Sequence, residues 1–242
     1  MNGYKALLCA VLGVCLLLCG CAGQTAAPDT AAATAEEAAD TNRATGWVET
    51  ARDETFRHTD KSGKEITAVY RIPKLTADTI DAQRMNADIN GKYNKLFDEA
   101  RETAAQNGSP EPETIDYSAY LNDDIVTIVI TGEGQSHSMT YEVYNYNKTT
   151  GKRLNNVELL NYLQRSYDDT FQALGKALEA DYTSKFKEEN FPDDYYYRLD
   201  LTLKETAVRQ SKLFLNQNGE LYAVCTEYAD VGDGAFQVLI RC

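Results

Sequence analysis

Histidine is scarce in this sequence, which has only His58 and His137 among its 242 residues. Zinc is usually held by several His and Cys side chains at short spacings, so this scarcity excludes a zinc site of the usual type. The chain also lacks the G-x-S-x-G motif and a glycine-rich phosphate-binding loop. Ser136 and Ser138 flank His137, but adjacent strand residues point to opposite faces and cannot form a nucleophile–base pair. We therefore expect no enzyme activity, no catalytic residue, no metal and no cofactor.

Basic residues are also few, with 24 Lys and Arg against 37 Asp and Glu and a formal net charge of -13. A negative field of this size repels nucleic acid and anionic wall polymers, and it speeds encounters with basic proteins. The other interpretation is that the charge only keeps the chain soluble. Nucleic acid is excluded as a partner under both interpretations.

Long apolar runs are absent as well. The run Ala6–Leu18 is shorter than the roughly 20 residues of a membrane-spanning helix, and it follows Lys5 as in an export signal. The segment Leu18-Cys19-Gly20-Cys21 resembles the lipobox of bacterial lipoproteins. The resemblance implies that residues 1–20 are a signal peptide and that Cys21 is diacylated, which anchors the protein to the outer face of the cell membrane. An ordinary secretory signal cut nearby, or an uncleaved anchor, is the alternative.

Residues 21–45 differ in composition from the rest of the chain. After Cys21 they are rich in Ala and Thr and contain no large apolar side chain, so they have nothing to bury in a core. We expect a solvated tether here. Residues 46–242 have a globular composition and are numerous enough for one sizeable core.

Periodicity and turn residues in residues 46–242 predict an α+β fold. We expect antiparallel sheets, with one long helix and one or two shorter helices packed against them, because hairpin-linked strands are set apart from the helices. The expected strands are 50–58, 65–73, 113–121, 124–131, 138–147, 212–216, 220–228 and 235–241, and the expected helices are 78–106, 168–186 and a short one near 200–209.

Two cysteines, Cys225 and Cys242, remain outside the signal and the anchor. A disulfide between them is one interpretation, since disulfides persist outside the cytoplasm. A hairpin between their strands would place Cys225 opposite Val238, however, four residues from Cys242. The other interpretation is that both are small buried hydrophobic residues.

Tyr144 and Tyr146 share one face of an expected strand by alternation. Tyrosines on an exposed sheet face form good binding platforms, so both are candidate ligand-binding residues. The alternative is that tyrosine, a good strand former, simply covers half-buried surface.

Three segments resemble a known family. Ile66–Leu75 runs through a proline into a helix, Tyr144–Lys152 ends in a Thr-Gly-Lys turn before Arg153–Leu160, and Phe214–Gly219 precedes the closing strands. They are similar to an extracytoplasmic domain of unknown function. That domain is found in the lysozyme-responsive anti-sigma factor RsiV and beside a peptidoglycan deacetylase domain.

The resemblance implies a non-catalytic binding or sensing module at the cell surface. Its expected partners are the membrane, through the lipid anchor, and a cell-envelope ligand, which is either a cell-wall glycan or a basic wall-active protein such as lysozyme. The alternative is a cell-wall-acting hydrolase or transferase whose active site the sequence does not reveal.

The lipid anchor gives a first prediction. Cys21→Ala should abolish metabolic labelling with an alkyne fatty acid and release the protein into the medium, because the acylated thiol is gone. Cys19→Ala is the matched control and should leave labelling unchanged. Undiminished labelling of Cys21→Ala would contradict the lipobox interpretation.

Overall fold

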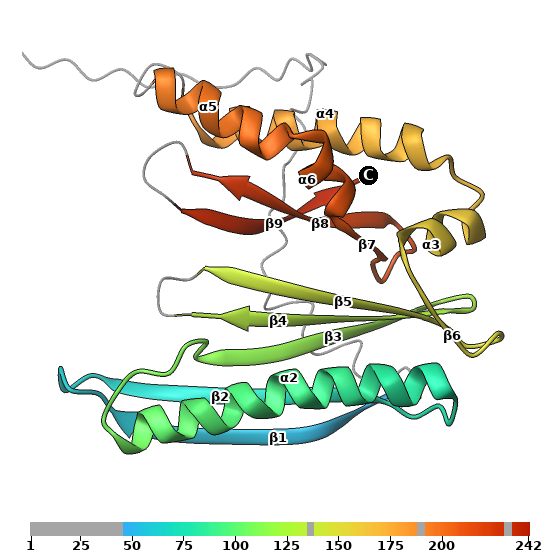
Figure 1. Cartoon of the computed structure of the whole chain (residues 1–242). Coiled ribbons are helices and arrows are strands. Elements are labelled where there is room, and N and C mark those ends of the chain that lie inside the picture. Colours follow the sequence, from blue (N-terminus) through green and yellow to red (C-terminus); the bar gives the residue numbers. More distant parts are fainter. Residues whose placement is uncertain (1–45, 135–137, 188–191, 230–233) are drawn as a thin grey trace, which may run out of the picture. The chain divides into compact units, whose positions relative to one another are not determined.

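The computed structural model describes residues 46–134, 138–187, 192–229 and 234–242, which form a mixed α+β domain (Figure 1). The predicted signal peptide, Cys21 and the tether lie outside these residues. No helix in the described part has both the length and the apolar character that crossing a membrane requires. The elements, in chain order, are β1 (Val48–Thr59), β2 (Glu65–Leu75), α2 (Ile80–Ala105), β3 (Thr114–Asn122), β4 (Ile125–Glu133), β5 (Met139–Asn147), β6 (Lys152–Leu154), α3 (Asn156–Tyr162), α4 (Tyr167–Lys185), α5 (Pro192–Leu203), α6 (Glu205–Gln210), β7 (Lys212–Leu215), β8 (Leu221–Tyr228) and β9 (Ala235–Arg241).

The larger sheet has six strands in the order β1-β2-β3-β4-β5-β6. Its pairs are antiparallel, as predicted, except for a short parallel pairing between β2 and β3 at Val69 and Thr114. This exception arises because α2 connects the two strands and returns the chain to the end of the sheet where β2 started. The first strand contains a bulge between Thr50 and Arg52, and the last strand, β6, has only three residues.

Strand β4 is buried on both faces, as its continuous apolar sequence predicts. Val126, Ile128 and Ile130 pack into a hydrophobic cluster with α2. On the other face, Val129 packs into a cluster between the two sheets, and Ile125 packs into a third cluster with α4. One strand therefore supplies side chains to all three clusters.

Helix α2 covers one face of the six-stranded sheet (Figure 1). It begins after Thr79, whose Oγ1 accepts a hydrogen bond from the Ala82 N–H at 3.2 Å. Asn86 fixes the helix to the end of β2, because its Oδ1 accepts from the Leu75 N–H (2.8 Å) and its Nδ2 donates to the Leu75 carbonyl (2.9 Å). The buried residues recur every three or four positions, as the period predicts: Ala82, Met85, Ile89, Tyr93, Phe97 and Ala100.

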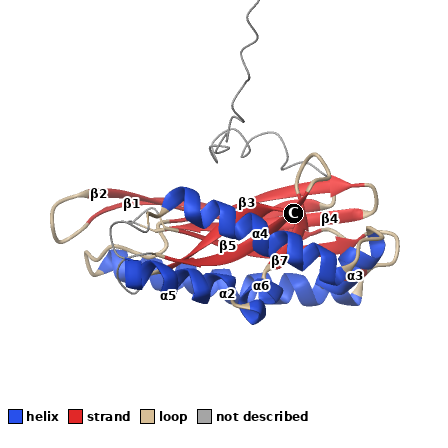
Figure 2. Cartoon of the chain, turned by 90° about the horizontal axis from the view of Figure 1, so that it is seen from above, coloured by secondary structure: helices blue, strands red, loops and turns tan. Residues whose placement is uncertain are grey.

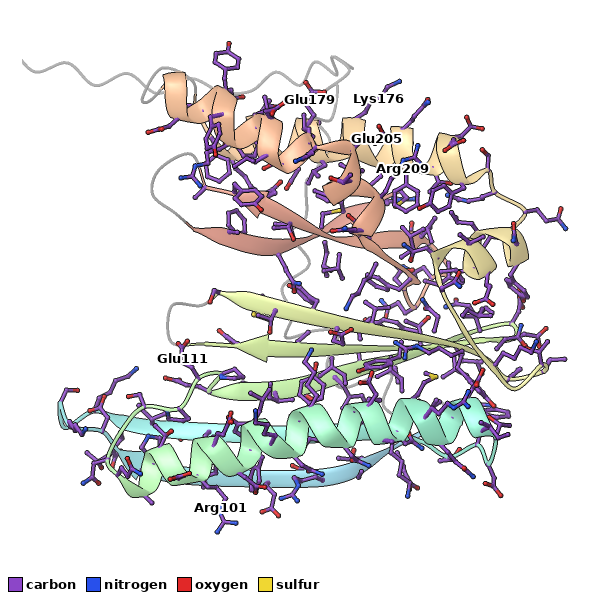
Figure 3. The ribbon with its side chains drawn as sticks, viewed as in Figure 1. Arg101, Glu111, Lys176, Glu179, Glu205 and Arg209 are labelled. Atoms are coloured by element: carbon purple, nitrogen blue, oxygen red, sulfur yellow. The ribbon has the colours of Figure 1, made fainter. Side chains whose placement is uncertain are left out.

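The smaller sheet has three antiparallel strands in the order β7-β8-β9. Helices α4 and α5 lie over the face that points away from the larger sheet (Figures 1 and 2). Helix α4 buries Phe171, Leu174 and Leu178 against that face, while Lys176 and Glu179 point away from it (Figure 3). The helix is amphipathic, and its apolar stripe determines which side faces the sheet.

Asparagine side chains join the two sheets. Asn145 of β5 is buried, and its Nδ2 donates to the Leu213 carbonyl of β7 at 2.7 Å. The Asn145 Oδ1 accepts from the Thr127 hydroxyl of β4 at 2.9 Å, so the buried amide is hydrogen-bonded at both ends. Asn122 makes a further link, because its Nδ2 donates to the Asn216 carbonyl at 2.8 Å.

The structure differs from the sequence prediction between residues 192 and 210. The sequence predicts one short helix near 200–209, whereas the chain forms α5 and then α6. The missed helix begins at Pro192, a residue type favoured at the first helical position. Its tyrosine run, Tyr195–Tyr197, has low helix propensity, so tertiary packing rather than local preference makes this segment helical.

Gly151 gives a test of the Thr-Gly-Lys turn. Its φ is +70°, and a Cβ there would lie 3.0 Å from Thr79 Cγ2. Gly151→Val should therefore reduce the free energy of unfolding by about 1 kcal/mol or more in urea denaturation. Gly91→Ala, at an exposed helical position with open space around it, is the control and should raise stability by about 0.5–1 kcal/mol. Unchanged stability of Gly151→Val would contradict this turn geometry.

Candidate functional site

Tyr144 and Tyr146 are not exposed, so the expectation that they form a binding platform is wrong. Each side chain is only 1% exposed, because α2 covers the sheet face on which they lie. The Tyr144 hydroxyl donates to Asp88 Oδ2 at 3.0 Å, and the Tyr146 hydroxyl shares a hydrogen bond with Thr79 Oγ1 at 3.1 Å. Alternation correctly places both on one face, but it cannot tell which face a helix covers.

Cys225 and Cys242 are free thiols in the structure; Cys225 is buried and Cys242 is half-buried. The strand register places Cys225 opposite Val238, as expected, and the main-chain N–H of Cys242 donates to the Leu221 carbonyl. Burial raises the pKa of Cys225 to about 11 and that of Cys242 to about 12. Both thiols are therefore protonated at neutral pH and are poor nucleophiles.

The other residues considered for chemistry are His58 and the neighbouring Ser136 and His137. Ser136 and His137 lie outside the described residues. Both ring nitrogens of His58 are buried without a hydrogen-bond partner in the described part of the chain, so nothing there orients the imidazole as a base. No group of three or more His, Cys, Asp and Glu side chains among residues 46–134, 138–187, 192–229 and 234–242 is placed to hold a metal ion.

Glu227 is a fully buried carboxyl beneath α4. Burial and a hydrogen bond shared with Asp181 raise the pKa of Glu227 to about 7, against the opposing effect of Lys185, whose Nζ donates to Glu227 Oε2 at 3.0 Å. A paired carboxyl with a raised pKa is typical of glycoside hydrolases, but those pairs are about 5–9.5 Å apart and accessible to substrate. Glu227 is 0% exposed and its Oε2 accepts from Lys185, so substrate cannot reach it and it is a structural group.

A groove lies at the edge of the larger sheet. It has a volume of about 690 Å³ and lies where β5, β6, α3 and β7 meet the first turns of α2. Its apolar lining includes Val143, Leu154, Val157 and Leu213, and Tyr167 adds an aromatic ring. The charged lining residues are Asp81, Arg84, Glu142, Arg153, Glu158 and Lys212.

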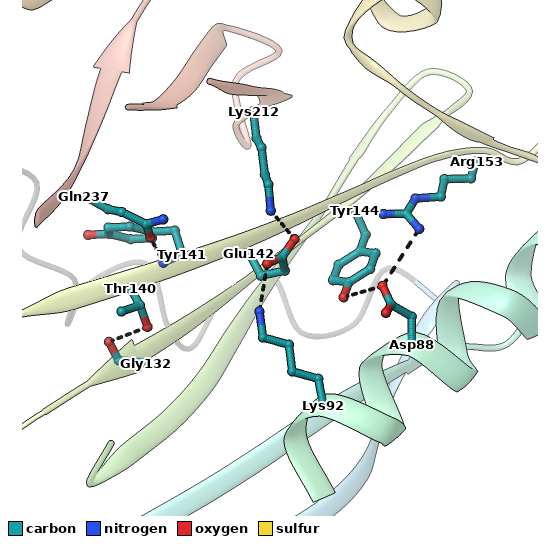
Figure 4. A network of polar contacts seen from close by, with 10 residues as sticks. All are labelled: Asp88, Lys92, Gly132, Thr140, Tyr141, Glu142, Tyr144, Arg153, Lys212 and Gln237. Carbon is teal, nitrogen blue, oxygen red and sulfur yellow. Dashed lines mark hydrogen bonds and ion pairs between the residues drawn. The ribbon is translucent and has the colours of Figure 1, made fainter. Parts of the chain in front are cut away.

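Glu142 forms the centre of an ion network on one wall of this groove (Figure 4). Lys92 of α2 donates to its Oε2 at 2.8 Å, and Lys212 of β7 donates to its Oε1. Burial alone would raise the pKa of Glu142, but the two lysine hydrogen bonds outweigh it and hold this pKa below its usual value. Glu142 therefore stays ionised and connects the helix to the second sheet across the edge of β5.

Arg153 and Asp88 form the neighbouring part of the network (Figure 4). The Arg153 guanidinium lies over the Tyr144 ring, 5.1 Å from its centroid, and its Nη1 is 3.8 Å from Asp88 Oδ2. The main-chain N–H of Arg153 donates to Asp81 Oδ2 at 3.1 Å. The sequence does not predict these residues as a group, because they come from α2, β5, β6 and β7 and no local spacing connects them.

Comparison with solved structures finds five matching chains. No protein-family model matches the chain, and no curated protein matches it. The structure is similar to the crystal structure of a member of the DUF3298 family from Bacteroides fragilis NCTC 9343, with 10% sequence identity and a TM-score of 0.35. The likeness covers 81% of this chain and 89% of that one. At this identity and TM-score no residue role is carried over.

The buried Glu227 predicts a pH-dependent stability. Because its folded-state pKa is raised, the folded chain binds more protons than the unfolded chain between about pH 4.5 and 7, and the free energy of unfolding should fall as pH rises through that window. Glu227→Gln should remove this contribution, so its melting temperature relative to wild type should increase between pH 5 and pH 8.

The exposed Glu179 of α4 is the control position. Glu179→Gln should follow the wild-type pH dependence. If the melting temperature of Glu227→Gln depends on pH in the same way as that of the wild type, the assignment of this pH dependence to Glu227 is wrong.

Proposed function

We propose that this protein is a lipid-anchored bacterial surface lipoprotein whose domain, residues 46–242, is a non-catalytic binding module for a cell-envelope glycan. The observation that carries this proposal is the groove beside β5 and β6. Its volume of about 690 Å³ lies within the usual range of roughly 300–1,000 Å³ for ligand sites. The lipobox at Cys21 supports the location, and the resemblance to the extracytoplasmic domain supports the setting.

The lining of the groove suits a sugar chain. Sugar rings have apolar faces that pack against aliphatic and aromatic side chains, and their hydroxyls hydrogen-bond to charged groups at the edge. The groove offers Val143, Leu154 and Tyr167 for the first kind of contact and its six charged residues for the second. Its position where several separate elements meet is typical of binding sites.

A non-catalytic role is proposed because the described titratable groups lack the arrangement of an acid–base pair around the groove. Glu142 is held ionised by two lysines, and Glu227, whose pKa is raised, is inaccessible. A hydrolase or transferase remains the alternative, and product formation distinguishes it from a binding module.

A basic wall-active protein such as lysozyme is the second candidate ligand. Cleavage before Cys21 removes Lys5, leaving 24 − 1 = 23 basic residues against 37 acidic ones, a net charge of about -14. This charge favours encounter with basic proteins, but long-range attraction between exposed charges is largely screened beyond about 8 Å at 0.15 M salt.

Titration calorimetry of the soluble Cys21→Ala chain with a wall-derived tetrasaccharide tests the groove. Val157 lines the groove and is 49% exposed, so Val157→Trp should fill part of it and weaken binding by about tenfold or more, equivalent to about 1.4 kcal/mol. Leu121→Trp, at a 38% exposed position on β3, is the matched control and should bind like the parent.

Three results would contradict the proposal. They are no binding by the parent chain, equal binding by Val157→Trp, or release of cleaved sugar. The last result would favour the enzyme. A parallel titration with lysozyme at 0.15 M salt tests the second candidate, which requires binding that persists at that salt concentration.

A further inference from the structure

Two arginines on the groove wall are only loosely engaged by their neighbours. Arg84 Nη1 lies 3.6 Å from Asp81 Oδ1, and Arg153 Nη1 lies 3.8 Å from Asp88 Oδ2. Both separations exceed the 2.7–3.2 Å of a protein N–H···O hydrogen bond. The side chains are 77% and 47% exposed, respectively. Since a guanidinium has five N–H donors, most of this donor capacity is open to a ligand.

The two arginines share one carboxylate and therefore belong to the same part of the wall. Asp81 Oδ1 faces Arg84, while Asp81 Oδ2 accepts the main-chain N–H of Arg153 at 3.1 Å. The Arg153 guanidinium is also held over the Tyr144 ring. Its orientation is thus set by packing before any ligand arrives, which lowers the entropy cost of binding.

The amides that line the groove are already committed to the fold. Asn145 bonds Thr127 and Leu213, as described above, and Asn156 donates to the Ser211 carbonyl (2.7 Å) and accepts from the Leu213 N–H (3.0 Å). Asn155 and Glu158 form the capping box of α3. Glu142 accepts from two lysines. The hydrogen-bonding capacity left in the groove is therefore dominated by the guanidinium donors.

We propose that Arg84 and Arg153 together bind an oxyanion, a carboxylate or a phosphate, carried by the glycan that occupies the groove. This inference rests on the proposed function and specifies its ligand class as an acidic saccharide. A guanidinium matches the two oxygens of a carboxylate or phosphate, and such charge-assisted pairs are roughly twice as strong as neutral hydrogen bonds. The oxyanion could belong to the carboxylate of a sugar acid or to the phosphate of a polyol phosphate, since a guanidinium binds both.

The acidic excess of the whole chain opposes this pairing at long range. Screening limits the opposition at 0.15 M salt, where exposed charges interact over about 8 Å. Of the carboxylates that line the groove, Glu142 accepts from two lysines and Asp81 accepts from the main-chain N–H of Arg153. The net charge therefore slows the approach of an anionic ligand, while the groove itself provides the donors that hold it.

The test uses the soluble Cys21→Ala chain and three defined probes at 0.15 M salt. The disaccharide of N-acetylglucosamine and N-acetylmuramic acid carries a lactyl carboxylate, diacetylchitobiose is its neutral counterpart, and a glycerol phosphate oligomer supplies phosphate. At least one anionic probe should bind about tenfold more tightly than diacetylchitobiose, as expected for a charge-assisted contact. The tighter of the two identifies the source of the oxyanion.

Variants then assign the preference to the arginines. Arg84→Ala and Arg153→Lys should each reduce the anionic preference severalfold, because each weakens binding of the anionic probe more than binding of diacetylchitobiose. Arg84 is mostly exposed and Arg153→Lys retains the side-chain charge, so both variants should fold, and their melting temperatures check this. Arg101→Ala is the control, because Arg101 lies near the other end of α2 and points away from the sheet (Figure 3).

The possible failures are distinguishable. Equal binding of the anionic probes and diacetylchitobiose by the parent chain overturns the oxyanion inference and leaves the glycan groove standing. A preference that survives in both arginine variants overturns the assignment to Arg84 and Arg153. If none of the three probes binds, the inference fails together with the proposed function.

Discussion

Burial of β4 on both faces is the constraint on which the other elements depend. An antiparallel strand with one solvent-exposed face needs only one covering layer. The segment Ile125–Ile130 instead has apolar side chains on both faces, and all of them are buried. Helix α2 alone covers Val126, Ile128 and Ile130, while the three-stranded sheet and α4 are needed for Val129 and Ile125. Neither layer can be removed without exposing part of the central strand to water. The layers therefore form one folding unit, although most strand pairs within each sheet are local hairpins.

The buried amide of Asn145 decides how the second layer sits on the first. Apolar contact between two sheets is non-directional, whereas an amide with both ends bonded permits few positions of the partner strand. Asn145 donates to the Leu213 carbonyl of β7, and Asn156 accepts from the Leu213 N–H. These bonds fix β7, and with it Lys212, beside β5. Hydrogen bonds within the protein therefore set the shape of the groove before a ligand binds.

Local sequence signals predicted most of the elements but few of the groove residues. Alternation and turn residues locate the strands, and the three-to-four-residue spacing in α2 locates the long helix, because these patterns reflect burial within one element. Three features depend on contacts between elements: the parallel pairing of β2 with β3, the helical state of Tyr195–Tyr197, and the burial of Tyr144 and Tyr146. The groove also depends on contacts between elements. Arg84 and Lys212 are more than a hundred residues apart in the chain, with Arg153 between them, and only the packed layers bring the three to one groove.

The two outer strands of the six-stranded sheet determine how easily a second copy of the domain could pair with it. An open strand edge offers unpaired main-chain groups to which a neighbouring molecule can add a strand. Here one edge, β1, is interrupted by a bulge at Thr50 and Arg52 and carries charged side chains, and the other, β6, is only three residues long. Neither β1 nor β6 is a long, flat template. These two strands should therefore be poor sites for a second copy of the domain to add a strand to the larger sheet.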